Sequence, residues 1–333
     1  MAVALQAADA LQRMGRPFPR ILAVHFIVVV LSFASTDCGR GGETLTGPTD
    51  LPSFASTAFL TTESDIELPL WPPAAPEVFV GAGDIALCTR DGNHEATAQL
   101  LDAIGGTVFA LGDNAYYSGT AAEYRDCYDR TWGRHKNRTR PVPGNHEYES
   151  PRASPYFDYF GINAGPHGLG YYSFDLGAWH VVALNSNIPV SAGSTQGAWL
   201  RADLATNRSR CTLAYWHHPR FSSGQHGNQE QMRDFWQILH EAGAEIVLSA
   251  HDHVYERFAP QDADGIPDPA HGVRQFVVGT GGARPYAFAS LHANSEVRMS
   301  TLGVLKLTLS ADEYTWEFIS VAGPGDSGTA SCH

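Results

Sequence analysis

The chain has 333 residues, and its 43% hydrophobic content supplies enough apolar side chains for one large domain with a buried core. Its formal net charge of -13 argues against nucleic acid and anionic membrane surfaces as partners, because both attract basic protein faces. An acidic protein that handles an acidic substrate needs a local source of positive charge, which bound metal cations would supply.

The N-terminal region predicts an export signal. Three basic residues, Arg13, Arg16 and Arg20, precede a short apolar stretch at residues 21–34. The stretch is too short to span a bilayer, so we assign residues 1–38 to a signal peptide. Cys38 is a candidate lipidated cysteine of a bacterial lipoprotein and the only expected membrane attachment, although Asp37 differs from the small residue such processing prefers. Periplasmic, cell-surface lipoprotein and extracellular locations are all open.

Residues 39–76 are rich in Gly, Ser, Thr and Pro and lack sustained periodicity, which predicts a linker. From Glu77 to the C-terminus, strand and helix patterns alternate, which predicts one α/β domain over residues 77–333. Four helices are expected, at residues 93–104, 120–131, 195–207 and 228–242.

The predicted strands fall into an early and a late set. They cover residues 78–80, 107–111, 211–216 and 245–249, a hairpin at 170–176 and 179–184, and a final group at 275–279, 303–309 and 314–320. The Pro-rich run 140–143 is not expected to be a strand. This order of elements predicts two mixed sheets with helices outside, a four-layer α/β/β/α sandwich.

Five cysteines in an exported protein suggest two disulfides and one odd thiol, for which Cys38 is the natural choice. We predict that Cys88 pairs with Cys127 and that Cys211 pairs with Cys332, although the spacing allows other pairings.

Five short segments place metal-binding side chains directly after an apolar run. The side chains are Asp84, Asp113 with Tyr116, Asn145 with His146, His217, and His251 with His253. Residues that follow successive strands of an open α/β sheet meet in the crevice at the carboxyl ends of those strands. The set therefore predicts a site for two adjacent metal ions, with Asp113 as the carboxylate that bridges them.

Each of these residues has a plainer interpretation when taken alone. An Asp after Gly is ordinary turn punctuation, and a lone His is usually a satisfied core or surface residue. We expect His218 to point away from His217, and Tyr117 competes with Tyr116 as a ligand.

The ordered motifs GDIA, GDNAY, GNHE, His217-His218-Pro219 and AHDH resemble those of the calcineurin-like metallophosphoesterase superfamily, and most closely the purple acid phosphatases. The resemblance covers residues 77–322. Most members carry Asp-x-His in the first motif, but here the third position is Ala86, which cannot bind a metal. Tyr116 fills that vacancy, as the corresponding tyrosine does in the purple group.

The resemblance implies two ligand sets. Asp84, Asp113, Tyr116 and His253 would hold Fe(III), and Asp113, Asn145, His217 and His251 would hold Zn(II), Mn(II) or Fe(II).

Two such metals would generate a metal-bound hydroxide as the nucleophile on a phosphate ester. His146 is the candidate general acid, and His226 is a second catalytic candidate because the purple acid phosphatases carry a substrate-contacting histidine there. Asp252 and Glu147 are candidates to orient ligand histidines. We expect an exported phosphomonoesterase acting on small phosphate esters. A phosphodiesterase with the same site, and a non-catalytic surface binding protein that keeps the fold, are the alternatives.

Overall fold

The computed structural model describes residues 75–333 of the chain. The predicted signal peptide, Cys38 and most of the predicted linker lie outside the described residues. Within the described part, every helix falls short of the length and apolarity that crossing a bilayer requires.

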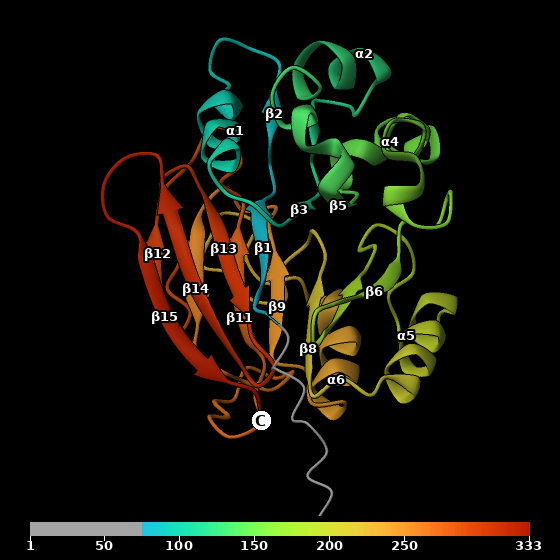
Figure 1. The fold of residues 1–333 in the computed structure, drawn as a ribbon, viewed down its shortest axis with the longest axis vertical. Helices are drawn as coiled ribbons and strands as arrows, with labels where there is room; N and C mark the ends of the chain where they lie inside the picture. Colours follow the sequence, from blue (N-terminus) through green and yellow to red (C-terminus); the bar gives the residue numbers. More distant parts are fainter. Residues whose placement is uncertain (1–74) are drawn as a thin grey trace, which may run out of the picture. The chain divides into compact units, whose positions relative to one another are not determined.

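Two mixed sheets form the framework of the domain (Figure 1). The first sheet has the order β15 (Asp326–Ser331), β14 (Glu313–Ser320), β13 (Gly303–Leu309), β1 (Glu77–Ala82), β3 (Thr107–Leu111), β5 (Thr139–Val142). The second has the order β12 (Ser295–Met299), β10 (Tyr255–Phe258), β11 (Arg274–Val278), β9 (Ile246–Ser249), β8 (Cys211–Tyr215), β7 (Trp179–Ala183), β6 (Tyr172–Leu176). In the first sheet the parallel strands β1, β3 and β5 lie at one end, and in the second the central strands β7, β8, β9 and β11 run parallel.

Helices connect and cover these strands. They are α1 (His94–Asp102), α2 (Ala121–Glu123), α3 (Asn145–Tyr148), α4 (Ser154–Phe160), α5 (Thr195–Thr206) and α6 (Arg233–Glu241). A π-helical turn (Tyr124–Tyr128) follows α2, and 3-10 turns cover Trp132–Arg138, Pro151–Ala153, Gly161–Ala164 and Glu230–Met232.

The alternation of side chains along β8 shows how the layers are built. Leu213 and Tyr215 belong to the core between the sheets, where the Tyr215 ring lies 5.7 Å from that of Phe79 on β1. Ala214, from the opposite face of β8, packs in a second core with Trp236 of α6. Burying each large side chain contributes about 1.5–3 kcal/mol, so both faces of the strand favour this layering. The predicted α/β/β/α sandwich is confirmed.

Three local predictions need correction. The Pro-rich third segment does form a strand, β5, which pairs only with β3 and lies at the edge of its sheet, where the missing N–H of Pro141 is tolerated. The expected helix over residues 120–131 is instead the short α2 and a π-helical turn, in which the Asp129 N–H donates to the Tyr124 carbonyl. Strands β10, β12 and β15 were not predicted; β12 and β15 are short, polar edge strands.

Both predicted disulfides are present. Cys88 is bonded to Cys127, and Cys211 at the start of β8 is bonded to Cys332 near the C-terminus.

Candidate metal centre

The two Gly-Asp segments leave the first sheet side by side. Asp84 follows β1 and Asp113 follows the neighbouring parallel strand β3, and the Ile85 N–H donates to the Asp113 carbonyl at 2.9 Å. Asp84, Asp113 and His251 all adopt left-handed backbone conformations, with φ of 56°, 48° and 69°. Such conformations are costly for residues other than glycine, and their concentration at one place is typical of a functional site.

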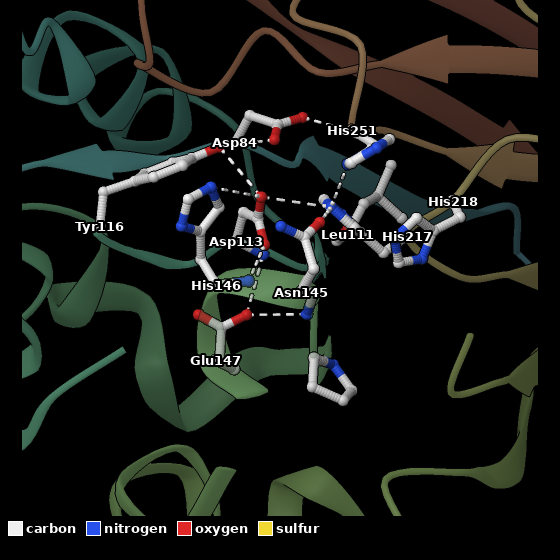
Figure 2. Close-up of polar contacts among 12 residues, drawn as sticks. Asp84, Leu111, Asp113, Tyr116, Asn145, His146, Glu147, His217, His218 and His251 are labelled. Atoms are coloured by element: carbon white, nitrogen blue, oxygen red, sulfur yellow. Dashed lines mark hydrogen bonds and ion pairs between the residues drawn. The ribbon is translucent and has the colours of Figure 1, made fainter. Parts of the chain in front are cut away.

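A first group of donor atoms converges around the Tyr116 hydroxyl (Figure 2). This oxygen lies 2.6 Å from Asp84 Oδ1, 3.2 Å from Asp113 Oδ2 and 3.2 Å from His253 Nε2. Tyr116 is 3% exposed, whereas the competing Tyr117 is 58% exposed. The structure therefore brings together the four residues predicted for the first metal, and Tyr116 is the tyrosine that faces them.

A second group converges around His217 Nε2. This nitrogen lies 3.2 Å from Asp113 Oδ2, 3.1 Å from Asn145 Oδ1 and 3.2 Å from His251 Nδ1. The other ring nitrogen of His217 donates to the Leu111 carbonyl at 2.8 Å, which fixes the ring. Asp113 Oδ2 thus takes part in both groups.

The donor chemistry fits two cations. Asp84 is fully buried and Asp113 is 2% exposed. Within residues 75–333, neither carboxylate forms an ion pair with Lys or Arg; their partners of opposite potential charge are histidines. Burying two carboxylates costs several kcal/mol unless positive charge compensates them. Mixed carboxylate, phenol, amide and imidazole donors suit hard and borderline metal ions.

The pKa shifts of His217 and Tyr116 also show that the site has an excess of negative charge. Burial opposes protonation of His217, but the Asp113 carboxylate outweighs burial and raises the pKa of His217 to about 9. Burial, with Asp84 and Asp113 nearby, raises the pKa of the Tyr116 phenol well above its ordinary value. Without a cation the phenol therefore stays protonated, and a bound cation would favour the phenolate.

Glu147 does not orient a ligand histidine, contrary to our expectation. Its buried carboxylate accepts backbone N–H groups from residues of two motifs: Gly144 at 2.7 Å, Asp113 at 2.9 Å, Asn114 at 2.8 Å and Ala115 at 3.2 Å. Glu147 is the third residue of α3, and by accepting the Gly144 N–H it satisfies a backbone donor at the start of that helix. Its role is to hold the GDNAY and GNHE segments together.

The expectation for His218 was also wrong. Its ring centroid lies 5.0 Å from that of His217 and 4.5 Å from that of His251, and Figure 2 shows it beside them. The His217, His218 and His251 rings each offer a nitrogen within 4.8 Å of the others. His218 Nδ1 is hydrogen-bonded to Ser186 Oγ at 2.7 Å. Its position next to His217, in the segment that follows β8, was the sequence signal that could have indicated this.

The two candidate catalytic histidines both lie beside the donor groups. His146 Nδ1 donates to the Tyr117 carbonyl at 2.5 Å, and its Nε2 lies 3.8 Å from Asp113 Oδ2. The ring of His226 lies 4.2 Å from that of His251.

In the Gly279–Gly282 turn, the Gly279 and Gly281 N–H groups donate to the Val254 and Gly83 carbonyls, so these two groups are engaged within the fold.

Residues 78–255, more than half of the chain, match the family described as calcineurin-like phosphoesterase. The chain belongs to this family.

Its curated relatives include purple acid phosphatases of Arabidopsis thaliana, as the motifs predicted. Purple acid phosphatase 21 is 31% identical over 234 residues, covering 64% of this chain and 52% of the relative. Purple acid phosphatase 15 is 32% identical over 227 residues, covering 56% of this chain and 42% of the relative. The chain thus spans about half the length of these relatives.

Solved structures show the same fold. The purple acid phosphatase PPD1 from yellow lupin seeds superposes with a TM-score of 0.68 at 20% identity, covering 78% of this chain and 54% of that one. GAP50, described as the anchor in the inner membrane complex of Plasmodium, has a TM-score of 0.59 at 12% identity, covering 78% and 90% of the two chains.

Proposed function

We propose that this protein is a metal-dependent phosphoester hydrolase that releases phosphate from small phosphate monoesters. The observation that carries the proposal is the position of Asp113 Oδ2, which lies 3.2 Å from both the Tyr116 hydroxyl and His217 Nε2 and so belongs to both donor groups. A carboxylate in this position can bridge two cations, the arrangement used for in-line displacement at phosphorus.

The two donor groups support two metal sites, and the resemblance to the purple acid phosphatases suggests which metals they take. Asp84, Asp113, Tyr116 and His253 would hold Fe(III), and Asp113, Asn145, His217 and His251 would hold Zn(II), Mn(II) or Fe(II). When bound, such a pair of cations lowers the pKa of water and neutralises charge on the phosphoryl oxygens.

The protein residues then manage the proton of the leaving group. The Tyr117 carbonyl accepts from His146 Nδ1, so the Nε2 edge is turned toward Asp113 and can carry a proton to the departing oxygen. His226, beside His251, is placed to contact the substrate from the opposite group.

Export is part of the proposal. The two disulfides are typical of extracellular or secreted proteins, because the cytosol keeps thiols reduced.

The fold alone does not assign catalysis, since a protein described as an anchor shares it. The complete donor set favours an enzyme over a non-catalytic binding protein.

The test compares hydrolysis of a nitrophenyl phosphate monoester with that of the bis-nitrophenyl diester. We expect the monoester to be preferred, and Asp113→Asn to lower kcat by about a hundredfold or more, because charge stabilisation in the transition state is lost. The exposed Asp158, 71% exposed in its side chain, provides the matched control Asp158→Asn, which should retain the wild-type rate. Unchanged hydrolysis in Asp113→Asn, or no hydrolysis of either ester by the metal-loaded wild type, would refute the proposal; a preference for the diester would reassign the substrate class.

A further inference from the structure

Asp252, between the two histidines of the AHDH segment, forms no hydrogen bond to a histidine side chain within residues 75–333. It is fully buried, and its carboxylate instead accepts the His226 N–H at 2.9 Å, the Tyr286 O–H at 2.8 Å and the Ser222 O–H at 2.5 Å. Two of these donors belong to the loop of residues 222–226, here called the His226 loop. Asp252 therefore connects the AHDH segment to the loop that carries His226.

The His226 loop packs directly on this carboxylate. A Cβ atom at Gly224 would lie 2.2 Å from Asp252 Cγ, so only glycine allows the loop to approach so closely. The Gly224 N–H donates to Ser222 Oγ at 3.0 Å, which keeps that hydroxyl aimed at Asp252. The loop and the carboxylate form one packed unit.

A second buried carboxylate holds the start of the loop. Glu256 on β10 accepts the Ser223 N–H at 2.8 Å. His226 itself depends on Asp252, because no other hydrogen bond of its backbone N–H competes with this one in the described part of the chain.

Tyr286 completes the arrangement from a separate segment. Its ring stacks on that of His253, with centroids 5.0 Å apart and an interplanar angle of 24°, while its hydroxyl donates to Asp252. It also lies 6.2 Å, centroid to centroid, from His226. One side chain thus touches both the first donor group and the support of the His226 loop.

We propose that Asp252 and Tyr286 are positioning residues that hold His226 over His251, where it meets the substrate. The kinetic consequence of this proposal rests on the proposed function, whereas the support of the His226 loop by Asp252 and Tyr286 is independent of it. Removing the support should free the His226 loop without removing any donor atom of the two metal groups.

The first test measures hydrogen–deuterium exchange of peptides that contain residues 222–226. Asp252→Ala should raise exchange of the His226 amide about tenfold or more, because its buried acceptor is lost. Asp262 also accepts two backbone N–H groups, from Asp264 and Ile266, but in a separate turn, so Asp262→Ala is the matched control and should leave the loop unchanged. Should Asp252→Ala fail to fold, Tyr286→Phe and Ser222→Ala each remove one of the bonds. Unchanged loop exchange in all three variants would overturn the proposal.

The second test is a double-mutant cycle in the hydrolysis of a nitrophenyl phosphate monoester. If Asp252 acts through His226, Asp252→Ala and His226→Ala should each lower kcat by about tenfold or more, which is the range for a lost proton-transfer or substrate contact. The double variant should then be no slower than the slower of the two single variants. Asp252→Asn keeps an acceptor oxygen and should recover part of the rate. Metal content should be unchanged in every variant.

The outcomes separate the two proposals. An inactive, metal-loaded wild type would refute the phosphatase and leave the exchange measurement as the test of loop support. If the wild type is active and the losses of kcat in the two single variants multiply in the double variant, Asp252 acts independently of His226. If Asp252→Ala loses metal, Asp252 acts on the metal ligands. Either result would overturn the positioning role.

Discussion

At the scale of single residues, both carboxylate oxygens of Asp113 have defined partners. Its Oδ2 is shared by the two donor groups, and its Oδ1 accepts the His146 N–H at 2.9 Å. Both oxygens are therefore engaged, one toward the proposed cations and one toward the segment that carries the candidate acid. Asparagine at this position would keep the shape but lose the charge.

Tyr116 offers a spectroscopic prediction at the same scale. A phenolate bound to Fe(III) gives rise to a charge-transfer band in the visible range. The iron-loaded wild type should therefore absorb visible light. Tyr116→Phe keeps a buried ring and should fold, but the visible band should disappear because the oxygen donor is gone. Tyr117→Phe, at the exposed neighbour, should keep the band. A band of full intensity in Tyr116→Phe would show that another residue is the ligand.

At the scale of elements, a histidine outside the metal site links a hairpin to a helix. His180 on β7 lies 3.0 Å from Asp175 on β6 through Nδ1 and 2.8 Å from Asp203 on α5 through Nε2. Burial opposes protonation of His180, but the carboxylates of Asp203 and Asp175 outweigh burial and raise the pKa of His180. Burial opposes ionisation of Asp203, but the hydrogen bond from His180 outweighs burial and lowers the pKa of Asp203.

These opposite shifts give a pH window. The contribution of His180 is complete below its unfolded pKa of about 6.5 and is lost as pH rises through its higher folded value. The contribution of Asp203 is complete above its unfolded pKa of about 3.9 and is lost as pH falls through its lower folded value. We therefore expect His180→Gln to lower the thermal midpoint most between about pH 4 and pH 6.5, and progressively less above that range. A difference between wild type and variant that stays constant from acid to alkaline pH would contradict a charged pair.

The elements that the sequence predicted well share strong apolar patterns. The strand at residues 107–111 and that at 303–309 have the predicted bounds. Each is a run of mostly apolar residues; the first lies between Gly106 and Gly112, and the second begins at Gly303 and ends before Ser310. The polar edge strands β12 and β15 carry no such pattern, since only pairing with a neighbour defines them.

The same contrast holds within the site. The convergence of the donor side chains was predictable because they follow strands whose carboxyl ends meet. The directions of His218 and Asp252 were not, because in irregular backbone a side chain's direction depends on tertiary contacts such as Ser186 for His218. Glu147 lies in the single turn α3, and its direction depends on backbone donors of the GDNAY segment.

At the scale of the whole molecule, the net charge affects the binding of an anionic substrate, and the disulfides stabilise the framework of the site. A formal charge of -13 repels an anionic ester unless the site carries positive charge of its own, which two bound cations would provide. The Cys211–Cys332 bond closes 121 residues of chain and ties the C-terminus to the start of β8. Cys88–Cys127 joins segments on either side of the GDNAY motif, so both bonds brace the framework that positions the donors.

The proposed function requires that two cations share Asp113, and anomalous X-ray diffraction from crystals of the active protein tests this requirement. We expect two anomalous peaks about 3.5–4 Å apart, one bounded by Asp84, Tyr116 and His253 and the other by Asn145, His217 and His251, with Asp113 Oδ2 between them. Active protein whose crystals show a single peak, or peaks away from these side chains, would contradict the claim.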